Sequence, residues 1–168
     1  MKVIFLDIDG VLNVIPKDFD EFGGIFHEDF INNLGDIIDK TGAKLVISSS
    51  WRVMGIDWLR DMWKHRNYPG EIIDITPTEK DVVFLGIKSH YDLVDRGDEI
   101  KLWLDNYDVD SYVILDDDND MLEEQRNNFV RTSNNSHHPD CIDMGYGLTR
   151  ICAEKAINIL NKKYGKIH

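Results

Sequence analysis

The sequence predicts an α/β fold with an open, mostly parallel sheet and helices on both faces. Short apolar runs alternate along the chain with segments whose apolar residues recur at helical spacing, a pattern typical of a parallel sheet. The chain has 168 residues, which suffices for one full hydrophobic core and is short for two. We therefore expect a single domain over residues 1–168.

The first expected strand, residues 3–6, is an unbroken apolar run that is followed at once by Asp7 and Asp9. Such a run is typical of a strand that is buried on both faces. Carboxylates are rarely buried without a partner. We therefore expect a divalent cation to compensate the two aspartates at the end of this strand.

The next part of the chain predicts a loop, a helix and a strand. Residues 14–26 contain proline and glycine and are expected to form a loop or short hairpin over the strand end. From His27 the apolar residues recur at helical spacing, and Gly42 lies where a helix C-cap is expected. Residues 43–47 form the next expected strand, which ends at Ser48.

The middle of the chain is less regular. A second expected helix, residues 56–63, is stopped by a Pro-Gly pair at residues 69–70. Residues 71–91 include an expected strand at 72–75 and resemble a small insertion in their remainder. Within that remainder, residues 82–85 are a further strand or a part of the insertion.

The last third repeats the alternation of helix and strand. An expected helix from Asp98 to residue 107 precedes a strand at residues 112–115. A short helix at residues 121–128 and a strand at 129–132 follow. Thr149 is the expected N-cap of a final helix.

Polar groups follow three of the expected strands at their carboxyl ends. They are Asp7 with Asp9, residues 48–50, and residues 116–118. In open α/β sheets the ligand lies at this edge, so the three groups should converge. Carboxylate oxygens suit Mg²⁺. Beside that ion, one aspartate can attack a phosphoryl group while a second carboxylate moves protons.

These motifs resemble those of the haloacid dehalogenase (HAD) superfamily of phosphatases. The opening DIDGVL is similar to the superfamily's DxDG(T/V)L motif, and Ser48 after LVI resembles its Ser/Thr motif. Asp116 and Asp117 after YVIL resemble its acidic motif. For its basic motif, which neutralises phosphate, Arg96 in RGDEI fits best and Lys88 is the alternative.

The resemblance implies a three-layer Rossmann-like fold with a minimal cap or none, and a role for each motif residue. Asp7 would be the nucleophile, and Asp9 would be the general acid/base with its backbone carbonyl on the metal. The implied phosphate-binding residues are Ser48, Ser49, Arg52 and Arg96. The implied Mg²⁺ ligands are Asp7, Asp9, Asp116 and Asp117.

Shorter motifs narrow the resemblance. SSSWR, RGDEIxxWL and GLT are similar to a small HAD group associated with RNA repair, and more distantly to the 3′-phosphatase part of phage polynucleotide kinases. This implies an Mg²⁺-dependent phosphatase that forms an aspartyl-phosphate and acts on a nucleic-acid end or a nucleotide. A small-metabolite phosphatase with residues 71–91 as a lid, and a non-catalytic phosphate- or metal-binding module, remain alternatives.

The net charge and the cysteine content limit which partners and which cellular setting can be expected. Lys and Arg total 19 against 31 Asp and Glu, a net charge of −12. This disfavours an extended nucleic-acid surface or an anionic membrane, so short ends or mononucleotides fit better. Cys141 and Cys152 lack CxxC spacing, which gives no support for a disulfide framework. Without a signal or membrane-spanning segment, we expect a cytoplasmic protein. The sequence does not indicate its oligomeric state.

Several other polar and aromatic residues have simpler explanations. His137, His138 and Cys141 predict a surface loop within residues 134–147 rather than a second metal site. Asp118 and Asp120 are expected to belong to an acidic loop. The tryptophans are expected in the core, although the first of them adjoins the expected site and could stack on a base. They are Trp51, Trp58, Trp63 and Trp103.

Overall fold

The computed structural model describes residues 1–132 and 146–162. Its centre is a five-stranded sheet in the order β5-β4-β1-β6-β7, and every neighbouring pair is parallel. The predicted parallel α/β sheet is therefore confirmed. The strands are β1 (Lys2–Leu6), β4 (Lys44–Ile47), β5 (Ile72–Ile75), β6 (Ser111–Asp116) and β7 (Phe129–Arg131).

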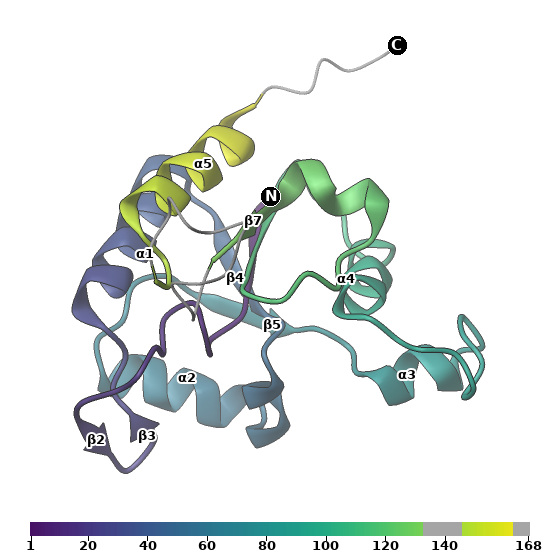
Figure 1. Ribbon diagram of the computed structural model, residues 1–168, viewed down its shortest axis with the longest axis horizontal. Helices are drawn as coiled ribbons and strands as arrows, with labels where there is room; N and C mark the ends of the chain where they lie inside the picture. The colour runs from purple at the N-terminus through teal and green to yellow at the C-terminus, as the bar shows by residue number, and fades with distance from the viewer. Residues whose placement is uncertain (133–145, 163–168) are drawn as a thin grey trace.

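Helices cover both faces of this sheet (Figure 1). The described helices are α1 (Glu28–Thr41), α2 (Ile56–His65), α3 (Glu79–Phe84), which packs on α4, α4 (Arg96–Leu104) and α5 (Arg150–Asn161), with 3₁₀ helices η1 (Ser50–Met54) and η2 (Glu123–Asn128). Ile4 and Leu6 of β1 pack with residues of α1, α2 and α5. Val3 and Phe5 point to the opposite face, where Phe5 meets Trp103 of α4 edge to face at 5.3 Å. The three-layer arrangement is thus confirmed, because strand side chains alternate between the two layers of helices.

Two helix boundaries follow the expected capping residues. Gly42 adopts a φ of 69° after α1, and its N–H donates to the Ile38 carbonyl at 2.7 Å. Glycine adopts this left-handed conformation without a steric penalty. At the start of α5, the Thr149 hydroxyl accepts from the Cys152 N–H at 3.3 Å. Both predicted caps are confirmed.

The segment at residues 71–91 differs from the expected insertion. Its strand at residues 72–75 is confirmed as β5, which pairs with β4 at the edge of the central sheet. Residues 82–85 are not a strand, because they lie in and directly after helix α3. A capping box between Thr78 and Asp81 starts this helix, and the Thr78 N–H donates to the Asp81 carboxylate at 2.7 Å.

Two further boundaries differ from the expectation. Helix α4 begins at Arg96 rather than at Asp98, because Asp95 is the N-cap and the Asp98 carboxylate accepts from its N–H at 2.9 Å. The expected short helix at residues 121–128 is present as the 3₁₀ helix η2, which begins two residues later, at Glu123. These local differences leave the order of strands unchanged.

Residues 14–26 form the expected short hairpin. Strands β2 (Phe19–Asp20) and β3 (Gly23–Gly24) pair in antiparallel fashion. Arg66, directly after α2, donates to both oxygens of Asp20 at 2.6 and 2.9 Å. These bonds hold the pKa of Asp20 at about 2 and tie the hairpin to α2.

Candidate active site

Strand register brings the expected site residues to one edge of the sheet. Leu6 of β1 pairs with Ile47 of β4 and with Leu115 of β6. The next residue of each strand follows the same register, so the Asp7 N–H donates to the Leu115 carbonyl at 2.9 Å and the Ser48 N–H to the Leu6 carbonyl at 3.1 Å. Asp7, Ser48 and Asp116 therefore lie side by side at the carboxyl end of the sheet.

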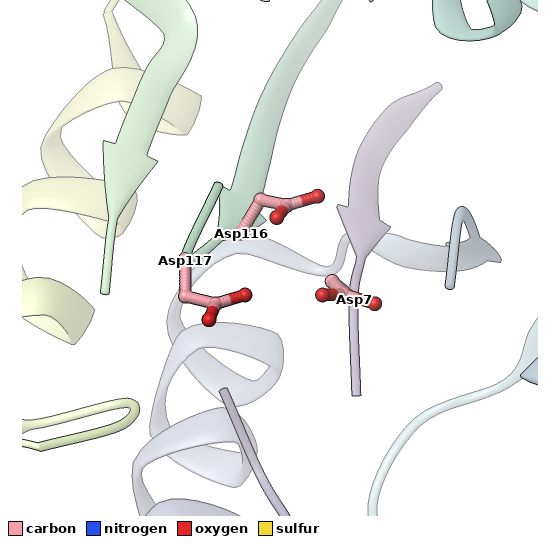
Figure 2. A group of neighbouring side chains, drawn as sticks. All are labelled: Asp7, Asp116 and Asp117. Carbon is pink, nitrogen blue, oxygen red and sulfur yellow. The ribbon is translucent and has the colours of Figure 1, made fainter. Parts of the chain in front are cut away.

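Three carboxylates cluster at this edge. Asp7, Asp116 and Asp117 each offer an oxygen within 4.8 Å of the others, and Figure 2 shows them converging from the ends of β1 and β6. Asp116 is fully buried, and its Oδ2 has no hydrogen-bond partner among the described residues. A buried oxygen of this kind, beside two further carboxylates, fits the hard oxygen ligands of Mg²⁺.

The electrostatics of the cluster favour a bound cation. Burial raises the pKa of Asp7, although the Arg96 charge opposes it. Burial and then the Asp7 charge raise the pKa of Asp116 well above its ordinary value, and the same two causes raise the pKa of Asp117 to about 6. Close carboxylates resist full ionisation. A divalent cation would relieve that repulsion.

Asp9 lies apart from the carboxylate cluster. Its side chain is exposed, with Oδ1 accepting from Asn13 Nδ2 at 2.6 Å and Oδ2 accepting from Trp51 Nε1 at 2.8 Å. The Asp9 carboxylate is therefore not a member of the three-residue metal cluster. Two side-chain donors instead fix its orientation just beyond Asp7.

Arg96 is the basic residue beside Asp7. Its Nη1 lies 3.2 Å from Asp7 Oδ1 and 3.4 Å from Asp116 Oδ2. The alternative residue, Lys88, binds Asp98 at 2.5 Å and the Leu93 carbonyl at 2.8 Å. The geometry therefore favours Arg96 over Lys88 for contact with a phosphoryl group at Asp7.

The glycine of the DIDG motif is required by the fold of the site. Gly10 has a φ of +76°, and a Cβ at this position would lie 2.3 Å from Cγ of Asp117. The Thr132 hydroxyl donates to the Gly10 carbonyl at 2.8 Å and fixes the turn from the other side. Only glycine allows the backbone to approach the Asp117 carboxylate this closely.

The serine segment after β4 carries an unpartnered hydroxyl. Ser48 is fully buried, and its Oγ has no hydrogen-bond partner among the residues that the structure describes. The Ser49 hydroxyl accepts from the Trp51 N–H at 3.3 Å, and its hydrogen bond with Asp7 partly opposes the burial that raises the pKa of that carboxyl. Ser48 thus offers a donor to a ligand, whereas Ser49 also supports the neighbouring backbone.

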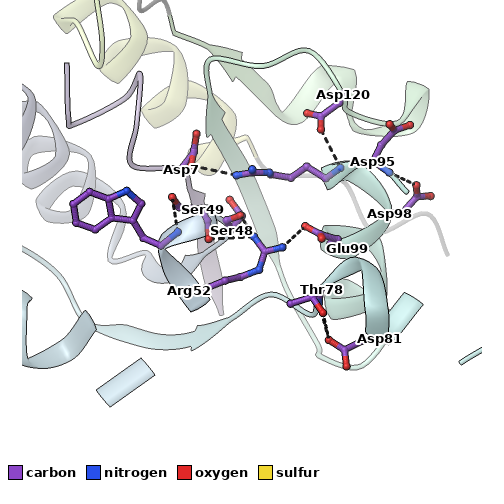
Figure 3. A network of polar contacts seen from close by, with 12 residues as sticks. Asp7, Ser48, Ser49, Arg52, Thr78, Asp81, Asp95, Asp98, Glu99 and Asp120 are labelled. Carbon is purple, nitrogen blue, oxygen red and sulfur yellow. Dashed lines mark hydrogen bonds and ion pairs between the residues drawn. The ribbon is translucent and has the colours of Figure 1, made fainter. Parts of the chain in front are cut away.

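Arg52, an expected phosphate-binding residue, contacts several protein groups. Its guanidinium donates to the carbonyl oxygens of Ser48 and Ser49, the latter at 3.1 Å, and to Glu99 Oε2 at 2.7 Å (Figure 3). The Arg52 and Glu99 side chains are 10% and 9% exposed. Through these contacts Arg52 anchors the serine segment to α4, while its buried Nε has no hydrogen-bond partner among the described residues.

Sequence reasoning did not identify three polar residues of this region. Glu99 lies three residues after Arg96 and therefore on the same side of α4, a spacing that was visible in RGDEI. Asn13 orients Asp9, and Asp120 accepts from the Arg96 N–H at 3.2 Å. No spacing rule links Asn13 or Asp120 to the site, because their contacts depend on how the loops return to the sheet edge.

Two other expectations concern the rest of the chain. His137, His138 and Cys141 lie outside the described residues. In the part of the chain that the structure describes, no helix combines the length and apolar character needed to cross a membrane.

Comparison with known families agrees with this geometry. Residues 3–136 match the family described as the HAD domain in Swiss Army Knife RNA repair proteins. No curated protein matches the chain. The matched span includes the sheet edge with Asp7, Ser48, Arg96 and Asp116. The chain therefore belongs to the HAD superfamily, as a member of the HAD domain family of Swiss Army Knife RNA repair proteins.

Proposed function

We propose that this protein is an Mg²⁺-dependent phosphatase that hydrolyses a phosphate monoester on a nucleic-acid end or a nucleotide. The observation that carries the proposal is the surroundings of Asp7, which clusters with the carboxylates of Asp116 and Asp117 and lies 3.2 Å from the guanidinium of Arg96. HAD domains are generally hydrolases, and membership in this family supports the same class of chemistry.

The chain's own residues divide the work of the reaction. Mg²⁺ would be held by Asp7, Asp116 and Asp117, and would neutralise charge on the phosphoryl oxygens. Arg96 and the unpartnered Ser48 hydroxyl would hold phosphoryl oxygens beside Asp7.

Covalent catalysis by Asp7 then proceeds in two steps. A carboxylate oxygen of Asp7 attacks phosphorus, the bond from phosphorus to the leaving oxygen breaks, and Asp9 donates a proton to that oxygen. In the second step Asp9 takes a proton from water, which attacks the phosphorus of the aspartyl-phosphate. Inorganic phosphate leaves and Asp7 returns to its starting carboxylate.

The fixed orientation of Asp9 supports its role as general acid and base. Asn13 and Trp51 hold its two oxygens at 2.6 and 2.8 Å, just outside the carboxylate cluster. A proton donor that is positioned next to the leaving oxygen contributes typically about 10²–10⁴-fold to the rate. The Arg52 contacts to the serine segment would keep Ser48 in place beside Asp7.

The proposed substrate class follows from the charge of the chain. A net charge of −12 opposes a long polyanion, so we propose a mononucleotide or a short nucleic-acid end as the substrate. We also place the enzyme in the cytoplasm.

The test is release of phosphate from an aryl phosphate with Mg²⁺ and with EDTA. Asp7→Asn should abolish turnover. Asp105→Asn is the matched control and should keep it, because the Asp105 carboxylate is exposed and pairs, within the described part of the chain, with Lys101 at 2.8 Å. Metal-independent release, or full activity of Asp7→Asn, would contradict the mechanism. Mg²⁺ binding without hydrolysis of oligonucleotide 3′-phosphates, nucleotides or sugar phosphates would instead indicate a non-catalytic module.

A further inference from the structure

A hollow of about 610 Å³ lies beside the proposed active site, between the β2–β3 hairpin and the segment from η1 to α2. Three aromatic rings form much of its wall: Phe22, Trp51 and Trp58. Phe22 and Trp58 meet edge to face at 5.3 Å, and the rings of Trp51 and Trp58 lie 6.2 Å apart. We name this space the aromatic hollow. Its volume falls in the range of small-molecule sites, and its rings hold one another in place.

Trp51 connects the aromatic hollow to the chemistry. It lines the hollow, and its Nε1 donates to Asp9 Oδ2 at 2.8 Å. Under the proposed function, Asp9 gives its proton to the leaving oxygen. The leaving group must therefore lie next to Asp9. On the side of Asp9 that faces the aromatic hollow, the neighbouring side chain is Trp51.

The walls of the hollow indicate what the leaving group presents to them. Val53 and Met54 are 85% and 53% exposed, although both are apolar. Glu21 is the only charged side chain among the described residues that line the hollow. A site without a lysine or an arginine does not suit a second phosphate, whereas stacked rings with an apolar rim suit a flat, uncharged ring system.

We infer that the aromatic hollow binds the base of a nucleoside leaving group. This inference rests on the proposed phosphatase function, because Asp9 links the hollow to the reacting phosphate. The base stacks against Trp51 and Trp58, and the ribose spans the distance to the phosphate at Asp7. The nucleoside can come from a mononucleotide or from the terminal residue of a short strand, since both offer the same base and sugar.

The kinetic test compares two substrates that differ in the base. The measured quantity is the ratio of kcat/KM for adenosine 3′-monophosphate to kcat/KM for glycerol 3-phosphate. Trp58→Leu removes the ring and should lower this ratio about tenfold, which corresponds to about 1.4 kcal/mol of lost stacking. Trp58→Phe keeps a ring and should retain most of the ratio. Tyr91→Leu is the matched control, because it removes a ring that is 86% exposed and lies outside the hollow.

A surface variant covers the case in which Trp58→Leu does not fold. Met54→Glu places a second carboxylate at the exposed rim and should also lower the ratio, because a base in the hollow would desolvate that carboxylate whereas glycerol 3-phosphate has no base to do so. A 3′-phosphorylated dinucleotide in the same assay distinguishes the two sources of the nucleoside. Dependence on Trp58 with either substrate supports the inference.

Binding of adenosine separates this inference from the proposed phosphatase. Adenosine, which has no phosphate, should quench the tryptophan fluorescence of Asp7→Asn, and Trp58→Leu should abolish that quenching. If no phosphate ester is hydrolysed but this quenching occurs, the hollow is a nucleoside site and the phosphatase proposal fails. An unchanged substrate ratio in Trp58→Leu, absence of quenching, or a preference for phosphotyrosine peptides over nucleotides would each overturn the inference.

Discussion

The Arg52–Glu99 pair allows a sharp test of how the serine segment is held. Replacing Glu99 with Gln removes one charge from a pair whose nitrogen and oxygen lie 2.7 Å apart and whose side chains are 10% and 9% exposed. Burial lowers the pKa of Arg52 and raises the pKa of Glu99, although each group's charge opposes the other's shift. Both shifts show that desolvation is the larger effect, so a lone charge here is unfavourable.

The size of the effect follows from this geometry. Unit charges 2.7 Å apart attract by about 6 kcal/mol at an effective dielectric constant of about 20. Much of that attraction offsets desolvation, and removing one member of a buried pair typically costs about 3–5 kcal/mol. Because Gln can still accept a hydrogen bond from Arg52, we expect a loss of about 3 kcal/mol. That is a large part of the 5–15 kcal/mol roughly typical of a domain.

Urea unfolding followed by circular dichroism measures this loss. Glu71→Gln is the matched control, because its pair with Lys44 spans 2.5 Å but is exposed by 64% and 45%. The control should lose less than about 1 kcal/mol. The double variant Arg52→Met with Glu99→Leu should recover part of the stability, since it leaves no charge of this pair buried alone but still loses the bonds from Arg52 to the Ser48 and Ser49 carbonyls. Equal losses in Glu99→Gln and Glu71→Gln would refute the reasoning that burial makes Glu99 necessary.

Three further predictions concern the carboxylate cluster and its glycine. Mg²⁺ should raise the thermal midpoint of unfolding, because a concentration of ten times its Kd adds about 1.4 kcal/mol to the free energy of unfolding. Asp117→Asn should reduce this stabilisation. An equal shift of the midpoint in the variant would exclude Asp117 as a ligand. The metal-free protein should lose stability in urea unfolding as the pH rises from about 4 through about 6. The reason is that burial raises the pKa of Asp117 to about 6 and raises those of Asp7 and Asp116, so the folded state binds more protons than the unfolded chain. A flat profile would contradict this, and Asp117→Asn should weaken the slope. Gly10→Ala should cost about 1–2 kcal/mol for its positive φ and also lower Mg²⁺ affinity in a thermal titration, because its Cβ would displace the Asp117 carboxylate. Gly42→Ala has a similar φ with nothing within 4 Å, so it should lower stability alone; loss of Mg²⁺ affinity in both variants would count against the Asp117 contact.

Local sequence patterns predicted most of the helices and strands correctly but failed at a few positions. The strand at residues 72–75 was predicted, but the neighbouring helix α3 was not, because a short apolar run fits either a strand or a buried helix turn. The capping box of Thr78 and Asp81 decides in favour of the helix. Trp58 was expected in the core with Trp63 and Trp103, yet it is only partly buried and lines the aromatic hollow.

The parallel sheet and the meeting of Asp7, Ser48 and Asp116 at its edge could be predicted from local sequence patterns alone. Buried strands must end where polar residues begin, and parallel strands bring those ends to one edge of the sheet. Tertiary packing was needed to show that Arg96 contacts Asp7 while Lys88 binds Asp98, that Arg52 pairs with Glu99, and that Trp51 binds Asp9. Each of these contacts links segments that are distant in the sequence. They depend on how long side chains pack across two helices and a hairpin, which no local spacing specifies.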